Sequence, residues 1–301
     1  MYNKNKLFHK SGDLQEYLVL EPNFNQRKTR VHLATYIQEV HALAIRLIKQ
    51  SIRRPSLIMT GIIQPLLWLT LFSALFQNAP IQLFTYGQKY GDFVSYGMIV
   101  FTAFTAALNS GLPIMFDREF GFFNRILSSA INSRSSIIIA SSINIALSSS
   151  IQIIFIMSII SIMGQSSPHI PNYTLVISVL FLLSNSVTSV SLALAFVLPG
   201  HIELLACILM LNLPLLFSST ALAPLIFMPS WLQILASLNP LTYAIEIVRY
   251  TYLNQIIVPT SKILTNVWGE ISVQQILIIL LVTNCLISLL SYMLIGNKFE
   301  D

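Results

Sequence analysis

Five long stretches of the chain contain no Asp, Glu, Lys or Arg and consist largely of apolar residues. A helix needs about 20 mostly apolar residues to cross a bilayer. The third stretch, residues 135–202, is long enough for two crossings, divided by the Gly- and Pro-containing segment 164–172. The pattern predicts an all-α polytopic membrane protein whose domain covers residues 55–296. Its six transmembrane helices are expected near residues 57–76, 93–113, 136–163, 173–198, 204–223 and 274–295.

Composition supports the membrane environment. The chain has 301 residues, of which 54% are hydrophobic and 10% charged, with a mean hydropathy of +0.71. Soluble domains carry about 25% charged residues, and a soluble globule of this size would lack the charge to cover its surface. A disordered chain is excluded as well, because there is ample apolar surface to bury.

The Lys and Arg residues predict the orientation. With six spans, the side that holds both termini receives 14 of the 17 basic residues and the opposite side receives 3. Basic residues concentrate on the cytoplasmic side of membrane proteins, so both termini are expected on the cytoplasmic side or its equivalent. Residues 1–54 carry ten basic and four acidic side chains, which accounts for the net charge of +5. Basic residues interleaved with aromatic ones are lacking, so no nucleic-acid partner is expected.

Residues 1–32 form a basic tail, and residues 33–54 are predicted to be an amphipathic helix in the cytoplasmic interface. Apolar residues recur there at three- and four-residue spacing. These positions are Leu33, Tyr36, Ile37, Val40, Leu43, Ala44, Leu47 and Ile48. A simple lipid anchor and a contact with a partner are equal alternatives for this helix.

The cytoplasmic loop over residues 116–134 combines charges with aromatic residues. Asp117 and Glu119 near the start of a helix, with Arg125 later, would suit the helix dipole. Such a helix could dock into a groove on a cytoplasmic partner. The competing interpretation is a solvated loop helix.

Residues 224–252, on the opposite side, are expected to form a re-entrant or interfacial helix pair. Pro240 suits the first turn of a helix, and Glu246 and Arg249 are three residues apart, within reach of one another. A structural ion pair is favoured over a gate for these two residues.

Polar residues also form two stripes inside the third and fourth predicted spans. Hydrogen bonds between helices are favoured over a substrate path for both stripes. The stripes consist of Ser141, Asn144, Ser148 and Gln152, and of Ser184, Thr188 and Ser191.

The sequence shows no motif for catalysis, nucleotide binding or metal binding. It has no P-loop, no GxSxG nucleophile elbow and no clustered histidines. Cys207 and Cys285 stand singly inside predicted spans and are interpreted as small apolar fillers. We therefore expect no catalytic residue, no cofactor and no metal. Energy for transport would come from another subunit or an ion gradient, and the charge-free spans argue against an ion-coupled carrier.

The order of these features resembles the membrane subunit of ABC-2 type exporters, and the resemblance covers residues 33–296. It is carried by Asp117-Arg118-Glu119-Phe120-Gly121, Arg125-Ile126-Leu127 and Arg134, and by Trp231-Leu232-Gln233, Asn239-Pro240-Leu241-Thr242-Tyr243 and Arg249. The family usually has a Pro before the second loop Arg, where this chain has Ala130-Ile131-Asn132-Ser133-Arg134. The absence of this proline bears on the local shape of the loop and not on the family resemblance.

The resemblance implies the ABC-2 exporter fold and a mechanism. Two permeases would work with two separate ABC ATPase subunits, and the loop after the second span would hold a coupling helix seated on the ATPase. The first and fifth spans would face the path between the permeases, and Glu246 and Arg249 would flank its outer end. The residues that would contact the ATPase are Asp117, Arg118, Glu119, Gly121 and Arg125.

The sequence leaves alternatives open for the function and for the membrane in which the protein resides. The alternative to a transport subunit is a membrane scaffold or assembly factor that recruits a cytoplasmic or stromal partner; an intramembrane hydrolase ranks third. Ile occurs 41 times and Ala 18 times, a bias typical of A- and T-rich genomes. A plastid (chloroplast) membrane is favoured on that ground, with a bacterial inner membrane as the alternative. The sequence does not specify the substrate.

Overall fold

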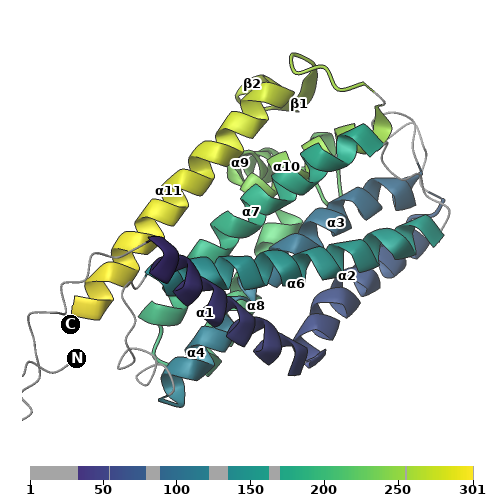
Figure 1. The fold of residues 1–301 in the computed structure, drawn as a ribbon. Helices are drawn as coiled ribbons and strands as arrows, with labels where there is room; N and C mark the ends of the chain where they lie inside the picture. Colours follow the sequence, from purple (N-terminus) through teal and green to yellow (C-terminus); the bar gives the residue numbers. More distant parts are fainter. Residues whose placement is uncertain are drawn as a thin grey trace, which may run out of the picture.

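The computed structural model describes residues 33–53, 55–78, 89–121, 135–162, 170–254 and 256–300. The basic tail over residues 1–32 and the loop residues Arg125 and Arg134 lie outside the described residues. The described chain is almost entirely helical (Figure 1). Its helices are α1 (Leu33–Arg53), α2 (Pro55–Leu75), α3 (Tyr90–Leu108), α4 (Gly111–Glu119), α6 (Ser135–Ile162), α7 (Ile170–Val197), α8 (His201–Phe217), α9 (Ser230–Leu238), α10 (Pro240–Leu253) and α11 (Val273–Glu300).

The helices that could cross a membrane coincide with the predicted spans. Four helical segments are long and apolar enough to do so, namely Tyr90–Glu119, Ile139–Ile162, Asn172–Val197 and Val273–Ile295. Two shorter apolar helices, Gly61–Leu75 and His201–Phe217, match the first and fifth predicted spans. The structure thus has four candidate spans within the described residues, and the count of six crossings stays a prediction.

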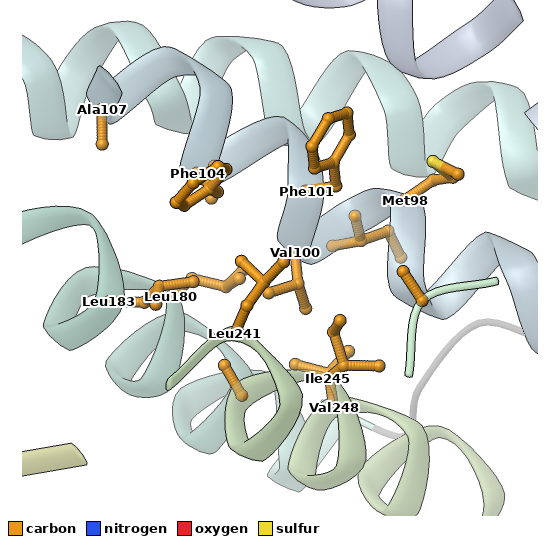
Figure 2. Close-up of a cluster of buried hydrophobic side chains, with 14 of the residues drawn as sticks. Met98, Val100, Phe101, Phe104, Ala107, Leu180, Leu183, Leu241, Ile245 and Val248 are labelled. Carbon is orange, nitrogen blue, oxygen red and sulfur yellow. The ribbon is translucent and has the colours of Figure 1, made fainter. Parts of the chain in front are cut away.

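Helix α3 forms the centre of the bundle. Nearly all of its side chains are buried, and it contacts α2, α6, α7 and α10 (Figure 1). Figure 2 shows Val100 and Phe104 of α3 beside Leu180 of α7 and Leu241 of α10. Helix α11 runs along α7, and most of its large apolar side chains are exposed. An apolar outer surface of this kind is what a lipid-facing helix requires.

Helix α1 lies across α6 (Figure 1). Val40, Ala44 and Leu47 are its buried residues, while Leu33 and Ile37 from the same predicted stripe are exposed. Part of the apolar face therefore packs on the bundle and part is left for another apolar surface. The structure has a helix over Leu33–Arg53, and the predicted amphipathic helix in a membrane interface stays a prediction.

A short antiparallel hairpin, β1 (Lys262–Asn266) and β2 (Gly269–Ser272), precedes α11 and is absent from the prediction. Asn266 pairs with Gly269 across the turn, and Gly269 has φ +119°, a conformation that favours glycine. Asn266 Oδ1 accepts a hydrogen bond of 3.0 Å from the backbone N–H of Trp268. The turn chemistry at these positions was the available signal.

Candidate functional site

Helix α4 continues the path of α3 after a turn at Asn109 and Ser110, and its start is fixed against α7. The Ser191 hydroxyl accepts a hydrogen bond from the Gly111 N–H at 2.9 Å and donates one to the Leu108 carbonyl at 2.5 Å. A Cβ atom at position 111 would lie 2.5 Å from the backbone carbonyl oxygen of Ser191. Glycine is therefore required here, because it allows the two helices to touch at the backbone.

Asp117, in the last turn of α4, is bonded to α1. The Arg46 guanidinium donates to the Asp117 carboxylate at 2.5 Å, and the Asp117 side chain is 12% exposed. Nearby, the Ser136 hydroxyl of α6 donates to Glu39 Oε1 of α1 at 2.6 Å. Two polar contacts thus hold α1 to the ends of α4 and α6.

Arg118 closes the C-terminal end of α7. Its Nη1 donates to the carbonyls of Ala195 and Phe196 at 2.7 and 2.8 Å. Its Nη2 donates to the Leu198 carbonyl and, at 3.1 Å, to the Pro199 carbonyl. The last four carbonyls of a helix have no partner within the helix, and a cation stabilises the negative end of the helix dipole. Arg118 supplies both donors and charge.

Glu119 contacts the N-terminal end of α8. Its Oε2 lies 2.6 Å from His201 Nδ1 and accepts a longer hydrogen bond, 3.4 Å, from the His201 backbone N–H. An acidic group at a helix N-terminus is favourable because the first N–H groups point toward it. The Phe116 ring lies 5.3 Å from the His201 ring and extends this contact.

Three consecutive charged residues therefore bind three different helices: Asp117 binds α1, Arg118 binds α7 and Glu119 binds α8. We call these residues the 117–119 triad. The expectation that Asp117 and Glu119 stand near a helix start was wrong, because both lie in the final turn of α4. Their partners at Arg46 and His201 were missed by the sequence analysis. The signal for His201 was its place directly after Pro199-Gly200, between two predicted spans.

The segment that follows the triad faces outward. Phe120 is 73% exposed, and its ring stacks on Phe116 at a centroid distance of 6.1 Å. Gly121 has φ +73°, with no described atom within 4 Å of the position a Cβ would take. Glycine lets the chain leave α4 in a left-handed conformation. Gly121 is the last described residue before the loop.

Glu246 and Arg249 form an ion pair at the opposite end of α3. Arg249 Nη1 donates to Glu246 Oε1 at 2.5 Å, and Arg249 is 3% exposed. Its Nη2 donates to the Thr220 carbonyl at 2.9 Å, and its guanidinium lies 3.7 Å above the Phe93 ring. The guanidinium is therefore fixed by α10, α3 and the segment after α8, as a structural ion pair would be.

Helices α9 and α10 enter the bundle from that same end. Leu241, in the first turn of α10, belongs to the same buried cluster as Leu180, which is ten residues inside α7 (Figure 2). Because an α-helix rises 1.5 Å per residue, Leu180 lies about 15 Å from the N-terminal end of α7. At the other end of α10, Asn172 Nδ2 donates to the carbonyls of Thr251 and Asn254 at 3.1 and 2.8 Å. Helix α10 thus packs along α7 and α3, and its re-entrant or interfacial position in a membrane stays a prediction.

Both predicted polar stripes supply contacts between helices. Asn144 of α6 accepts from the Ser51 hydroxyl of α1 at 3.3 Å, and Ser191 of α7 joins α3 and α4 as described above. Ser141, Gln152, Ser184 and Thr188 are buried. One residue of each stripe thus bonds to another helix, whereas Ser141 and Ser184 donate to carbonyls of their own helices. Within the described residues, no group of three or more His, Cys, Asp or Glu side chains is arranged to hold a metal ion.

The described chain is thus a bundle of apolar helices with α9 and α10 at one end and a charged junction of several helices at the other. Residues 38–253 match the ABC-2 type transporter family, and the chain belongs to this family. Transport permease ycf38 of Porphyra purpurea is 54% identical over 263 residues, covering 87% of this chain and 90% of its own length. The proteins of the same name in Pyropia yezoensis and Cyanophora paradoxa are 52% and 49% identical, covering 89% and 82% of this chain and 92% and 85% of their own lengths.

Proposed function

We propose that this chain is the membrane subunit of an exporter that is driven by a separate ATP-hydrolysing subunit. The observation that carries the proposal is the junction at the end of α4, where the 117–119 triad connects α1, α7 and α8. A force applied to the loop after α4 would reach three helices at once. Such a connection is what a permease without its own nucleotide site needs in order to respond to an external motor.

The ATPase contact is assigned to the outward-facing part of this junction. Of the five residues that the family resemblance implicates, Asp117, Arg118 and Glu119 are bonded within the chain. Direct contact then falls to Gly121 and Arg125, together with the exposed ring of Phe120. Aromatic residues and arginines are enriched among the residues that dominate the binding energy of protein interfaces. The 117–119 triad would not touch the ATPase, and would instead connect the contact surface to the other helices of the chain.

Two copies of the chain would form the transport path, with α2 and α8 facing each other across it. Both helices carry apolar side chains that are exposed in the single chain. On α2 these are Leu67, Leu71 and Leu75, and on α8 they are Leu209, Met210 and Leu213. Exposed apolar faces of membrane helices are covered either by lipid or by another helix. Glu246 and Arg249, in α10, would stand at the outer end of this path.

The orientation is inferred from the side on which the junction lies. The end of α4, the end of α7 and the starts of α6 and α8 share one end of the bundle with α1. That end receives the excess of Lys and Arg, so it is assigned to the cytoplasmic or stromal side together with both termini. Relatives of this chain are plastid-encoded in algae. A plastid membrane is accordingly the proposed location.

The proposal is tested by isolating the tagged chain from its native membrane and identifying what binds it. We expect a separate protein that carries a P-loop and hydrolyses ATP. Arg125→Glu should lower its recovery at least tenfold, because the substitution reverses the charge on the contact surface. The matched control is Lys262→Glu, a charge reversal on the opposite side of the bundle. Normal recovery of the ATPase with Arg125→Glu would refute the assigned contact.

The same preparation distinguishes a transporter from a scaffold or assembly factor. ATP hydrolysis by a subunit bound in fixed ratio to the chain supports transport. Isolation of the chain with a protein that binds no ATP, and without an ATPase, would refute the proposed function and favour the scaffold.

A further inference from the structure

We propose that Arg118 and Glu119 form a relay that turns motion at the end of α4 into motion of α8 and, through α8, of the re-entrant pair α9–α10. This inference rests on the proposed function, because it assigns the route by which an ATPase at the α4 loop would move the outer side. Both residues act through other groups and are therefore positioning residues.

The first step is the corner between α7 and α8. Only Leu198, Pro199 and Gly200 separate the two helices. The guanidinium of Arg118 binds carbonyls at the end of α7 and in the link, at Phe196 and at Pro199. Proline fixes its own φ, which restricts the short link further. The corner is therefore tight, and Arg118 holds it to the end of α4 as one unit.

The second step is α8 itself, which has little else to hold it. Its buried residues form a single stripe with a spacing of four: Leu204, Ile208, Asn212 and Leu216. The other apolar side chains of the helix are largely exposed. Three residues of this stripe, Leu204, Ile208 and Leu216, belong to the main hydrophobic core, so α8 can tilt about the stripe while its exposed face moves. The contact of Glu119 with His201 places the end of α4 on the first residue of this helix.

The third step is at the other end of α8. The Asn239 side chain donates from Nδ2 to the Leu215 carbonyl at 2.9 Å and to the Ser218 carbonyl at 3.4 Å. Its Oδ1 accepts from the Leu241 N–H at 3.0 Å and caps α10. One side chain thus joins the last turn of α8 to the inner end of the re-entrant pair. Displacement of α8 would move α9 and α10 with it.

Asp117 has a different role within the triad. It binds Arg46 of α1, a helix that packs on α6. This contact anchors the end of α4 to the interface helix and does not lead to α8. The triad therefore contains two arms, one to α1 and one to the α7–α8 corner, and the relay uses the second.

The experiment measures movement at the outer side directly. Ser230, the first residue of α9, is exposed. In a Cys207→Ala/Cys285→Ala background, Ser230→Cys carries a spin label. Pulsed electron resonance then gives the distance between the two labels in the permease pair, purified with its ATPase, with and without ATP plus vanadate. We expect a nucleotide-dependent change in this distance.

Arg118→Lys and Glu119→Gln test the relay. Lysine keeps the charge but loses the planar fork that binds several carbonyls, and glutamine removes the charge at the α8 terminus. Both should reduce the nucleotide-dependent change at least twofold while the ATPase stays bound and hydrolyses ATP. A structural role alone would lower the yield of folded protein without altering the response of the folded fraction. Lys262→Gln, which removes an exposed ion pair with Glu270, is the control.

An undiminished distance change in both variants would overturn the relay while leaving the proposed function intact. Failure of the unsubstituted chain to bind an ATPase, or to pair with a second copy, would instead overturn the proposed function. A loss of response in Lys262→Gln equal to that in Arg118→Lys would also overturn the relay, since the effect would then lack specificity.

Discussion

Glu246→Gln removes the negative partner of a guanidinium that is 3% exposed. Glu246 lies 2.5 Å from Arg249, and its own side chain is 12% exposed. Removal of one partner of a buried pair costs about 3–5 kcal/mol, because the other charge is left uncompensated. Here Arg249 keeps the Thr220 carbonyl at 2.9 Å and the Phe93 ring at 3.7 Å. We therefore expect Glu246→Gln to lower the free energy of unfolding by the lower end of that range, about 3 kcal/mol.

Thermal unfolding of the purified chain in detergent measures this loss. For a chain larger than 250 residues, about 2 °C of Tm corresponds to 1 kcal/mol, so Tm should fall by roughly 6 °C. The double variant Glu246→Gln/Arg249→Met should recover most of this loss, because replacing both charges of a buried pair by uncharged groups is often neutral. An unchanged Tm in Glu246→Gln, or equal losses in the single and double variants, would refute the reasoning.

Three further substitutions test contacts of the bundle. Gly111→Ala should lower stability by about 1–3 kcal/mol, because the new Cβ would lie 2.5 Å from a backbone carbonyl of α7; circular dichroism melting measures this, and an unchanged melt would contradict the close approach. Asn239→Ala should cost about 1–2 kcal/mol through loss of a helix cap, whereas the isosteric Asn239→Asp should keep the cap. Arg46→Met should raise the hydrogen exchange of α1 because the bond to Asp117 is lost; unaltered exchange would show that this bond does not hold the helix.

The positions of the membrane helices could be predicted because they depend on local composition. Runs of apolar residues without charges locate α3, α6, α7 and α11, as a lipid environment demands. The helix start at Pro240 and the Glu246–Arg249 pair depend on spacing within one helix and were equally accessible. The hairpin left a weaker signal, confined to its turn residues, since its strands have only five and four residues and bury one side chain, Leu264.

The charged junction could be predicted only in part. Sequence patterns single out Asp117, Arg118 and Glu119 as unusual charges between two spans, yet they give no direction for the side chains. The partners lie far along the chain: Arg46 is 71 positions from Asp117, and His201 is 82 positions from Glu119. Contacts of this kind depend on how helix ends meet in space. Consequently, residues that resembled an outward docking surface turned out to bind helices of the same chain.

Native mass spectrometry of the complex isolated from its membrane tests the central claim most directly. We expect an assembly of two copies of this chain with two copies of an ATP-binding subunit, and Arg125→Glu should separate the two permeases from the ATP-binding subunits. A chain that is recovered intact and folded, but alone or bound only to proteins without a nucleotide site, would contradict the account.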